Sequence, residues 1–466
     1  MNEPMGRVRR IHMVGMAGSG MCGIAEVLLN LGYEVSGSDL RDSPVLERLR
    51  SKGAVVHLAH RAGNLNEADV VVISSAVETD NPEVVAARER RVPVVPRAEM
   101  LAELMRFRYG IAVAGTHGKT TATSLIASVL MEADLDPTFV IGGRLQRAGV
   151  NARLGQSRYL VVEADESDAS FLQYKPMISV VTNVDRDHLG AYGDDFKRLQ
   201  ASFVEFLKQL PFYGRAILCA DDRQLARLAP ELGRPVSTYG FGQADFQAEK
   251  VVAEGERMRF TVRRPEAAPL EVVLNLPGRH NVENALAAIA VAAELEIPDE
   301  ALTAALENFD GVSRRMEILG EIRLGEGRAL LISDYGHHPR EIAATIEAVR
   351  EAWPGRRLLV VFQPHRYTRT HDLLDDFAAV LPTADVLVLA KLYPAGEKPL
   401  AGADTIALAR AIRSRGQLEP VYMPDLGELE STLDALAQDG DLVLVLGAGD
   451  IDRHARRLAA GRGRKS

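Results

Sequence analysis

The stretch Ala114-Gly115-Thr116-His117-Gly118-Lys119-Thr120-Thr121 decides the fold class of this chain. Apolar residues 111–113 precede it, and apolar residues at helical spacing follow it as far as Leu130. A strand, a glycine turn and a helix in this order form a phosphate cradle, because backbone N–H groups and the positive end of the helix face the anion. The stretch therefore predicts a nucleoside triphosphate site.

This cradle differs from the standard P-loop in its glycine spacing. Two residues lie between Gly115 and Gly118, where the usual motif has four. In a P-loop the lysine reaches a terminal phosphate and the hydroxyl binds Mg²⁺, so we expect these roles for Lys119 and Thr120. The alternative is a surface turn that contains Gly-Lys-Thr, but the strand before it and the helix after it argue against that.

Composition and charge narrow the class of protein. The 466 residues suggest about three domains, at roughly 150 residues each. The net charge of −9 argues against a nucleic-acid partner, and two cysteines do not make a disulfide framework. No apolar run is long enough to cross a bilayer. We expect a cytoplasmic protein without a membrane partner, either a monomer or a homodimer.

The pattern of apolar runs predicts an α/β fold of three domains. We expect a Rossmann-like domain at 1–106, a P-loop ATPase-like domain at 107–310 with a mostly parallel sheet, and a Rossmann-like domain at 311–466. Short runs at 235–276 predict a small antiparallel section in the central domain. We expect the basic tail from Arg462 to be disordered. Strands are expected at residues 11–14, 34–37, 70–74, 92–95, 159–162, 178–182, 216–219, 329–333, 358–362, 386–389 and 442–446.

A second glycine loop lies near the N-terminus. Gly18-Ser19-Gly20-Met21-Cys22-Gly23 follows a predicted strand and fits G-x-G-x-x-G, and Asp39 lies about twenty residues further on. Taken alone, this pattern favours NAD(P). Physically it requires only a diphosphate at a helix N-terminus and a carboxylate that binds hydroxyl groups, which a UDP-sugar also satisfies. Beside a separate ATP site, a nucleotide-diphosphate substrate is the better interpretation.

Polar clusters follow several predicted strands, where parallel sheets place their ligand-binding groups. The acidic stretch 163–168 suits Mg²⁺, and the stretch 183–188 ends in a histidine that suits a metal or a phosphate. In the third domain, residues 334–339 and 363–369 form two such clusters, and arginines in the second are suited to grip a carboxylate. The alternatives are solvated acidic loops, a structural histidine and surface ion pairs.

Several of these stretches together resemble the Mur ligases of bacterial peptidoglycan synthesis. The resemblance covers nearly the whole chain and is most specific to the members that add L-alanine, through residues 15–21, 334–339 and 362–369. A recycling member that adds a whole tripeptide is the alternative. The stretches that carry the resemblance are GTHGKTT (115–121), VEADESD (162–168), TNVDRDH (182–188), GRHNVENALAA (278–288), SRRME (313–317) and DYGHHP (334–339).

The resemblance implies an activity and its cofactors. ATP would phosphorylate the lactyl carboxylate of UDP-N-acetylmuramate, and the amine of L-alanine would attack the acyl phosphate to form an amide. ATP and two Mg²⁺ ions are implied, with Mn²⁺ as a possible substitute. The implied catalytic residues are Lys119, Glu163, His188 and Arg366, and the implied metal ligands are Thr120, Glu163 and His188.

The resemblance also implies three binding sites. The implied ATP contacts are Gly115, Thr116, His117, Gly118, Lys119, Thr120, Thr121, His280, Asn281, Asn284, Arg315 and Asp334. The implied contacts of the UDP part are Gly18, Ser19, Gly20, Met21, Asp39, Ser74 and Ser75. The implied amino-acid contacts are Tyr335, His337, His365, Arg366 and Arg369.

One departure concerns a lysine. Several family members that act at later steps carry a carbamylated lysine about fifteen residues after the metal histidine. Residues 201–206 hold no lysine here, and Lys197 and Lys208 flank the position without matching it. This supports the alanine-adding branch. Two hypotheses from other classes stay open, a nicotinamide-dependent oxidoreductase built on the first glycine loop and a nucleotide-sensing protein without turnover.

Overall fold

The fold was analysed in a computed structural model. It describes residues 5–74, 76–106, 108–146, 149–187, 189–325 and 327–463. The chain divides into two compact units, each described separately below. The first holds Met1–Lys250, Phe260–Val273 and Val282–Asp310, and the second holds the remaining segments, including Gly311–Ser466. No helix in the described ranges is long and apolar enough to cross a membrane.

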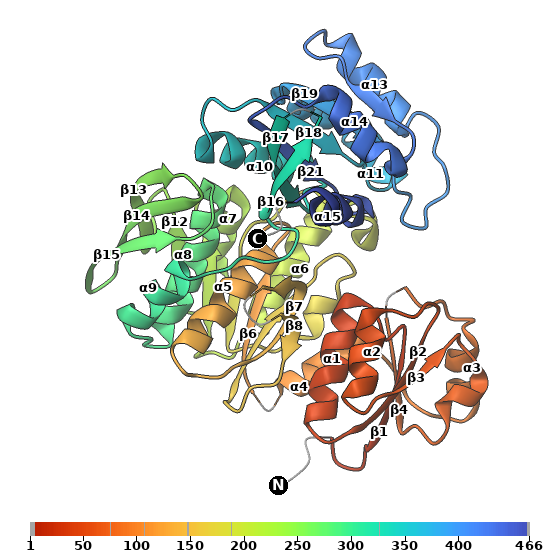
Figure 1. The fold of residues 1–466 in the computed structure, drawn as a ribbon. Coiled ribbons are helices and arrows are strands. Elements are labelled where there is room, and N and C mark those ends of the chain that lie inside the picture. The colour runs from red at the N-terminus through yellow and green to blue at the C-terminus, as the bar shows by residue number, and fades with distance from the viewer. Residues whose placement is uncertain are drawn as a thin grey trace. The chain divides into compact units, whose positions relative to one another are not determined.

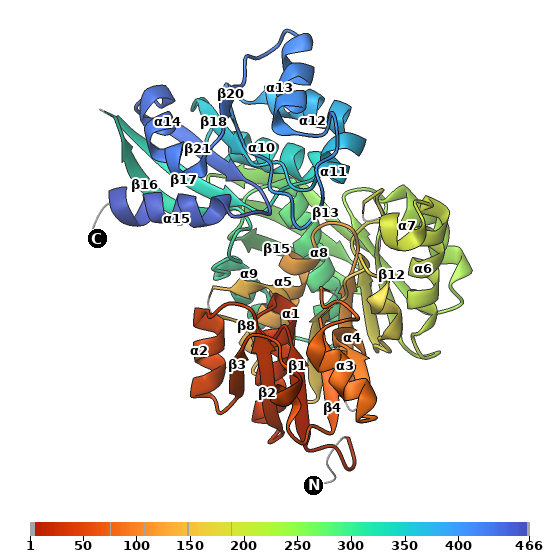
Figure 2. The ribbon, with the colours of Figure 1, turned by 90° about the vertical axis from the view of Figure 1, so that its right-hand side faces the viewer.

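A parallel sheet begins the first unit, as the N-terminal Rossmann-like prediction requires. Its strand order is β3-β2-β1-β4-β5, so the chain crosses over after β3. Figure 2 shows helix α2 (Pro44–Ser51) beside β3 and helix α3 (Pro82–Glu89) near the opposite side of the sheet. Its strands are β1 (Arg10–Val14), β2 (Glu34–Asp39), β3 (Val55–Leu58), β4 (Val70–Ile73) and β5 (Val94–Pro96).

The second sheet carries the phosphate cradle. Its order over the described residues is β15-β14-β13-β12-β11-β10-β6-β9-β7-β8. The middle strands are parallel, whereas two-residue turns join β13 to β14 and β14 to β15, which is possible only between antiparallel neighbours. The predicted mostly parallel sheet with an antiparallel section is confirmed. The strands are β6 (Tyr109–Ala114), β7 (Thr138–Leu145), β8 (Val150–Arg153), β9 (Tyr159–Glu163), β10 (Ile178–Val181), β11 (Arg215–Cys219), β12 (Val236–Gly240), β13 (Phe246–Glu254), β14 (Arg257–Arg264) and β15 (Ala267–Leu274).

Helices of the first unit position its loops. Helix α5 (Lys119–Glu132) follows β6 directly, and helix α1 (Ser19–Asn30) packs against β7 and β8 as well as against β2 (Figure 1). Helix α4 (Arg97–Met105) starts where β5 ends, and helix α6 (Phe196–Lys208) buries Phe203 and Phe206 against Phe171. The remaining helices with eight or more residues are α8 (Arg279–Glu294) and α9 (Asp299–Glu307).

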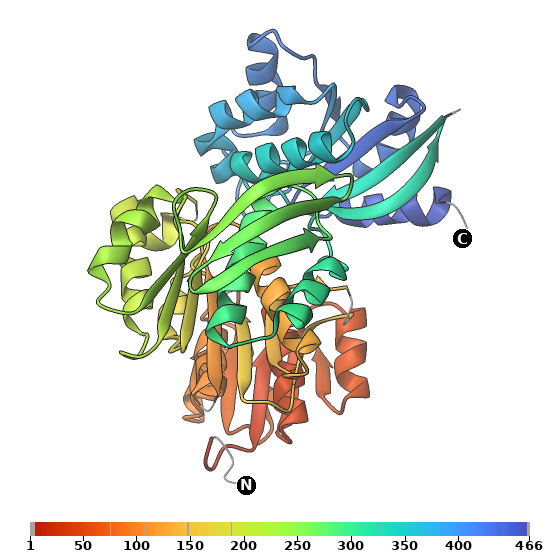
Figure 3. The ribbon, with the colours of Figure 1, turned by 90° about the vertical axis from the view of Figure 1, so that its left-hand side faces the viewer.

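The third sheet lies in the second unit and has apolar clusters on both faces. Its order is β16-β17-β21-β18-β19-β20, with an antiparallel pair at one edge and parallel pairs elsewhere. Figure 3 shows the β16–β17 hairpin with helix α15 (Ile451–Arg462) beside it. Its strands are β16 (Glu317–Leu324), β17 (Gly327–Asp334), β18 (Leu358–Phe362), β19 (Val386–Ala390), β20 (Val421–Met423) and β21 (Asp441–Leu446).

Helices alternate with the strands of this unit. Helix α10 (Pro339–Ala352) has its proline at the first helical position, as expected from the missing N–H of proline. Helix α11 (Tyr367–Asp372) follows β18, and α12 (Leu374–Val380), α13 (Thr405–Ser414) and α14 (Leu429–Leu436) complete the layers. The expectation of disorder at Arg462 is wrong, because this residue ends helix α15 and bonds Asp434.

Candidate functional site

The phosphate cradle requires both of its glycines. Gly115 and Gly118 have φ values of +132° and +82°, which disfavour side chains. A Cβ at Gly115 would lie 2.1 Å from Thr182 Oγ1, and one at Gly118 would lie 2.5 Å from Asn284 Oδ1. Asn284, an expected ATP contact, therefore lies against the cradle. The loop packs so closely against Thr182 and Asn284 that only glycine fits at either position.

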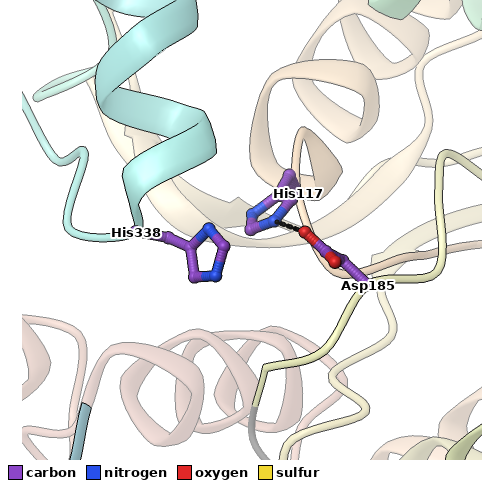
Figure 4. A group of neighbouring side chains, drawn as sticks. All are labelled: His117, Asp185 and His338. Atoms are coloured by element: carbon purple, nitrogen blue, oxygen red, sulfur yellow. Dashed lines mark hydrogen bonds and ion pairs between the residues drawn. The ribbon is translucent and has the colours of Figure 1, made fainter. Parts of the chain in front are cut away.

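The segment after β10 supports the cradle from behind. Asn183 accepts a hydrogen bond from the His117 N–H at 2.8 Å and donates one to the His117 carbonyl at 3.1 Å. The His117 ring lies 3.2 Å from Asp185 Oδ2, as Figure 4 shows, and the Asp185 N–H donates to Thr116 Oγ1. The expected ATP contacts Thr116 and His117 are thus held by residues of the stretch 183–185. His338, also drawn in Figure 4, caps helix α10 in the second unit.

Lys119 opens helix α5 at the mouth of the cradle. Its ammonium donates to the Gly115 carbonyl at 2.6 Å and to Glu166 Oε2 at 2.7 Å. Burial lowers the pKa of Lys119, but the carboxylates of Glu166, Asp165 and Glu163 outweigh burial and raise it overall. The lysine is therefore charged and in place for an anion at the glycine loop.

Two of the three expected metal ligands lie together. Thr120 Oγ1 is 3.0 Å from Glu163 Oε1, and Glu163 Oε2 accepts a hydrogen bond from the Gly142 N–H at 2.8 Å. Both ligand atoms are oxygens, and one belongs to a carboxylate, which is a ligand set that suits Mg²⁺. His188, the third expected ligand, lies outside the described residues, as does the expected UDP contact Ser75.

A pocket of about 240 Å³ is lined by the first glycine loop and by the expected metal ligand Glu163. Its lining includes Glu163 and Asp165 together with the expected UDP contacts Gly18, Gly20, Met21 and Ser74. Gly18 is the N-cap of helix α1 and offers no side-chain cap, so the first N–H groups of the helix remain available to an anion. The backbone of Ser19 opens this helix. The first glycine loop and the acidic stretch after β9, about 145 residues apart in sequence, therefore line one cavity.

Other residues of the first glycine loop shape the loop itself. Asp39 accepts hydrogen bonds from the N–H groups of Ala17 and Leu40 at 2.9 and 2.8 Å. A Cβ at Gly23 would lie 2.8 Å from the Ala152 Cβ on strand β8. The last glycine of the G-x-G-x-x-G pattern is therefore required by packing between α1 and the second sheet, and it carries no evidence for a dinucleotide.

Arg97 is a candidate site residue that the sequence analysis missed. It opens helix α4 directly after β5, lines the same pocket, and its guanidinium Nη1 would lie 2.8 Å from a Cβ at Gly20. The guanidinium therefore lies over the first turn of α1, where it adds positive charge to an anion site. Its place after a parallel strand is the signal that identifies it.

In the second unit, the expected amino-acid contacts gather around His365. The His365 ring lies 5.9 Å from the His337 ring and stacks on Tyr393 at 5.6 Å, and Arg369 Nη1 is 3.3 Å from His365 Nδ1. Burial and the nearby cations lower the pKa of His365 to about 3. This ring is therefore neutral at physiological pH. Tyr393, which the sequence analysis did not single out, forms one wall of the group.

Neighbouring residues connect this group to β17. Tyr335 lies 5.3 Å from His337, ring to ring, and the Arg315 guanidinium lies 4.9 Å from the Tyr335 ring. Arg366 takes a φ of +70° just before helix α11, a conformation that is uncommon for a residue with a side chain. The expected contacts thus lie in the two segments that follow β17 and β18, with Tyr335 and His337 in the first and His365, Arg366 and Arg369 in the second.

The remaining expected ATP contacts of this unit have local partners. Asp334 accepts hydrogen bonds from the N–H groups of Met316 and Gly336 at 2.8 and 2.7 Å. Burial lowers the pKa of His280, and the Arg315 charge adds to this while Asp334 opposes it. Asn281 donates to the Pro277 carbonyl at 2.8 Å. Asp334 and Asn281 therefore stabilise their own loops, and their contacts with ATP stay a prediction.

Comparisons with known proteins cover the chain from end to end. Residues 10–109 match the Mur ligase family catalytic domain, residues 113–292 the Mur ligase middle domain, and residues 314–449 the Mur ligase glutamate ligase domain. The chain is similar to the UDP-N-acetylmuramate–alanine ligase of Thermotoga maritima, with 30% identity, a TM-score of 0.82, and coverage of 97% of this chain and 98% of that one.

Two similar structures belong to peptide ligases. The murein peptide ligase of Psychrobacter arcticus shares 25% identity at a TM-score of 0.71, over 98% of this chain and 99% of that one. The UDP-N-acetylmuramate:L-alanyl-γ-D-glutamyl-meso-diaminopimelate ligase of Neisseria meningitides shares 31% identity at a TM-score of 0.61, over 66% of this chain and 100% of that one.

Proposed function

This chain belongs to the Mur ligase family, and from that premise we propose that it joins L-alanine to the lactyl carboxylate of UDP-N-acetylmuramate at the expense of ATP. The observation that carries the proposal is the pocket that Glu163 shares with the first glycine loop. A carboxylate-bearing UDP-sugar bound by that loop has its reactive end directed towards the phosphate cradle. Such a ligase acts in peptidoglycan precursor synthesis, for which we propose a cytoplasmic location.

The first step is transfer of the γ-phosphoryl group to the sugar-linked carboxylate. Phosphoryl transfer needs positioning and neutralisation of charge more than covalent help from the protein. Lys119 holds the terminal phosphate at the cradle, and the helix α1 N-terminus with Arg97 holds the diphosphate of the sugar nucleotide. Thr120, Glu163 and His188 would hold Mg²⁺, which when bound reduces the repulsion between the carboxylate and the phosphate.

The second step is attack of an amine on the acyl phosphate. We propose that Arg366 or Arg369 binds the carboxylate of the amino acid, since guanidinium groups bind carboxylates with paired hydrogen bonds. The neutral His365 and the Tyr393 ring then form the floor of the amino-acid pocket. The amine displaces phosphate and an amide remains, so that ADP and phosphate leave as products.

The acceptor amine distinguishes two candidates within the family. Identity of 30% over nearly the whole chain favours the alanine ligase. The peptide ligases, at 25% over the whole chain and 31% over part of it, support a tripeptide-adding enzyme as the second candidate. No observation in the family assignment supports a nicotinamide-dependent oxidoreductase.

An assay of phosphate release tests this proposal. With ATP, Mg²⁺ and UDP-N-acetylmuramate, we expect release only when L-alanine is added, together with a product heavier by one alanine residue in mass spectrometry. Release that needs no amino acid, or a product formed only with the tripeptide, would contradict the proposal.

A further inference from the structure

Glu166 is a buried carboxylate that the proposed reaction does not use. Only 1% of its side chain is exposed, and it lies three residues beyond the expected metal ligand Glu163. Its Oε2 is 2.7 Å from the Lys119 ammonium, whereas its Oε1 has no hydrogen-bond partner among the described residues. The Tyr192 hydroxyl donates to the Glu166 backbone carbonyl at 2.5 Å and fixes the segment. A buried carboxylate with one oxygen that accepts no hydrogen bond destabilises the folded protein, so a functional reason for its presence is expected.

Lys119 directs its hydrogen-bond donors into the protein. The ammonium has three N–H groups, and its acceptors are Glu166 Oε2, the Gly115 carbonyl at 2.6 Å and the Thr116 carbonyl at 3.3 Å. The lysine side chain is only 12% exposed. A terminal phosphate needs at least one of the same N–H groups. The carboxylate of Glu166 is the negative partner that a phosphate would have to replace.

The charge of Glu166 depends on that lysine. Burial raises the pKa of the Glu166 carboxyl to about 7, with Lys119 opposing the rise and the neighbouring Asp165 adding to it. The charged pair therefore stabilises an anion that the site would otherwise disfavour. A nucleotide phosphate beside Glu166 adds repulsion and draws the ammonium away, so the pair is weakest when nucleotide is bound.

We propose that Glu166 is a positioning residue that holds the Lys119 ammonium in the empty nucleotide site and releases it to the terminal phosphate when nucleotide binds. This inference rests on the proposed role of Lys119. The free energy gained when Lys119 binds the phosphate is then partly offset by the free energy needed to separate Lys119 from Glu166. After phosphoryl transfer, return of the lysine to Glu166 favours departure of ADP. Glu166 thus weakens nucleotide affinity in favour of turnover.

The Glu166→Gln variant tests this competition. The amide is close in shape but uncharged, so we expect it to tighten binding of ADP and of a non-hydrolysable ATP analogue by about tenfold, the size expected for loss of one charge-assisted hydrogen bond. Isothermal titration calorimetry measures the two dissociation constants. Asp168→Asn is the matched control, because it removes one charge from the same acidic loop, where Asp168 binds the Ser170 N–H instead of Lys119. Equal or weaker binding by Glu166→Gln would overturn the inference, since a merely structural role predicts loss of affinity.

A second measurement applies if Glu166→Gln does not fold. In a crystal structure of the wild-type enzyme with ADP or the ATP analogue, the Lys119 ammonium should contact a phosphate and lie beyond hydrogen-bond distance of Glu166. An unchanged pair of Lys119 and Glu166 beside a bound nucleotide would overturn the inference. Failure of the wild-type protein to bind any nucleotide would instead contradict the proposed function, so the two failures are distinguishable.

Discussion

Single residues in this protein are constrained most tightly where the backbone approaches a ligand site. Gly115 and Gly118 combine a positive φ with a neighbour that leaves no room for a Cβ. The shortened glycine spacing of the motif therefore corresponds to a specific packing of the cradle against Thr182 and Asn284. The sequence analysis identified the motif, but the partners behind it lie about 65 and 165 residues further along the chain and carry no local signal.

Gly118→Ala should reduce nucleotide binding and destabilise the fold. The added Cβ would lie 2.5 Å from Asn284 Oδ1, and the alanine would have to adopt the left-handed φ of Gly118. We therefore expect the free energy of unfolding to fall by about 2–3 kcal/mol. Gly53→Ala is the control, because Gly53 has a φ of +101° with no atom within 4 Å of the added Cβ. Urea unfolding with nucleotide titration checks both variants. Equal costs at the two positions would show that the contact with Asn284 does not matter.

Thr120→Val should weaken metal binding while keeping the helix start. Valine matches threonine in shape but lacks the hydroxyl that lies 3.0 Å from Glu163. We expect the Mg²⁺ concentration for half-maximal turnover to rise about tenfold, the effect of losing one oxygen donor with its hydrogen bond. Thr120→Ser, which retains the hydroxyl, should stay near wild type. An unchanged Mg²⁺ requirement in Thr120→Val would remove this residue from the metal site.

Glu83 makes stability sensitive to acid. Burial raises its pKa, but the His12 ring 3.6 Å away and hydrogen bonds from Ser38 and Asn64 outweigh burial and lower the pKa from 4.5 to about 2. The lower pKa in the folded state stabilises the protein by up to about 3 kcal/mol above pH 4.5, and this contribution is lost as the pH falls towards 2. The free energy of unfolding should therefore fall more steeply between pH 5 and 3 in wild type than in Glu83→Gln. Parallel curves would contradict this assignment.

Helices and strands show where sequence patterns are informative. Apolar runs in the middle of the third sheet predicted β18 at its observed bounds and β21 within one residue, because buried parallel strands are continuously apolar. Several strands at a sheet edge or next to one were missed, among them β7, β8 and β16. β7 contains Gly142 and Gly143 and pairs with β8 through a register shift, and β16 alternates exposed and buried residues beside a glycine. These strands depend on their neighbours more than on their own composition.

The same reasoning applies to the site. Polar residues after parallel strands converged as expected, since those strand ends meet at one edge of a sheet. Arg97 and Tyr393 also follow parallel strands, but they were not identified, because the groups that they join form only through tertiary packing. Where other family members carry a lysine, helix α6 instead packs Phe203 and Phe206 against Phe171.

Gly23→Ala tests the packing of helix α1 on the second sheet. Its new Cβ would lie 2.8 Å from the Ala152 Cβ, so α1 must shift and carry the first glycine loop with it. We expect the KM for UDP-N-acetylmuramate to rise about tenfold with the KM for ATP unchanged, because small displacements of a binding loop cost on this scale. Gly63→Ala is the control, since no atom lies within 4 Å of its added Cβ. Steady-state kinetics with each substrate varied in turn measure the two KM values. A rise of both KM values together would contradict the prediction.

At the scale of the whole molecule, the proposed reaction is distributed over separate parts of the chain. The UDP part, the triphosphate and the amino acid are each assigned to a different sheet. The domain boundaries at residues 106 and 310 stay a prediction; the three family matches follow the same order, with the first ending at residue 109 and the third starting at residue 314. Because each substrate has its own site, we expect a substitution in one site to leave binding at another site unchanged.

Lys119→Ala should abolish turnover and leave binding of UDP-N-acetylmuramate within about twofold of wild type. In the proposed mechanism the lysine acts on the phosphate, whereas the sugar nucleotide binds at Gly18, Gly20 and Arg97. Calorimetric titration of the variant with UDP-N-acetylmuramate measures the second quantity. Loss of that binding would mean that the two sites are not energetically separate.

The central claim is that the acceptor is L-alanine, and a direct competition tests it. Purified enzyme, ATP, Mg²⁺ and UDP-N-acetylmuramate are mixed with equal concentrations of L-alanine and the L-alanyl-γ-D-glutamyl-meso-diaminopimelate tripeptide, and the two products are quantified by mass spectrometry. Because the ratio of products equals the ratio of kcat/KM values, it reports specificity alone. The account predicts that the alanine product dominates by at least about a hundredfold, since a pocket built for one amino acid leaves no room for the longer acceptor. A dominant tripeptide product would contradict it.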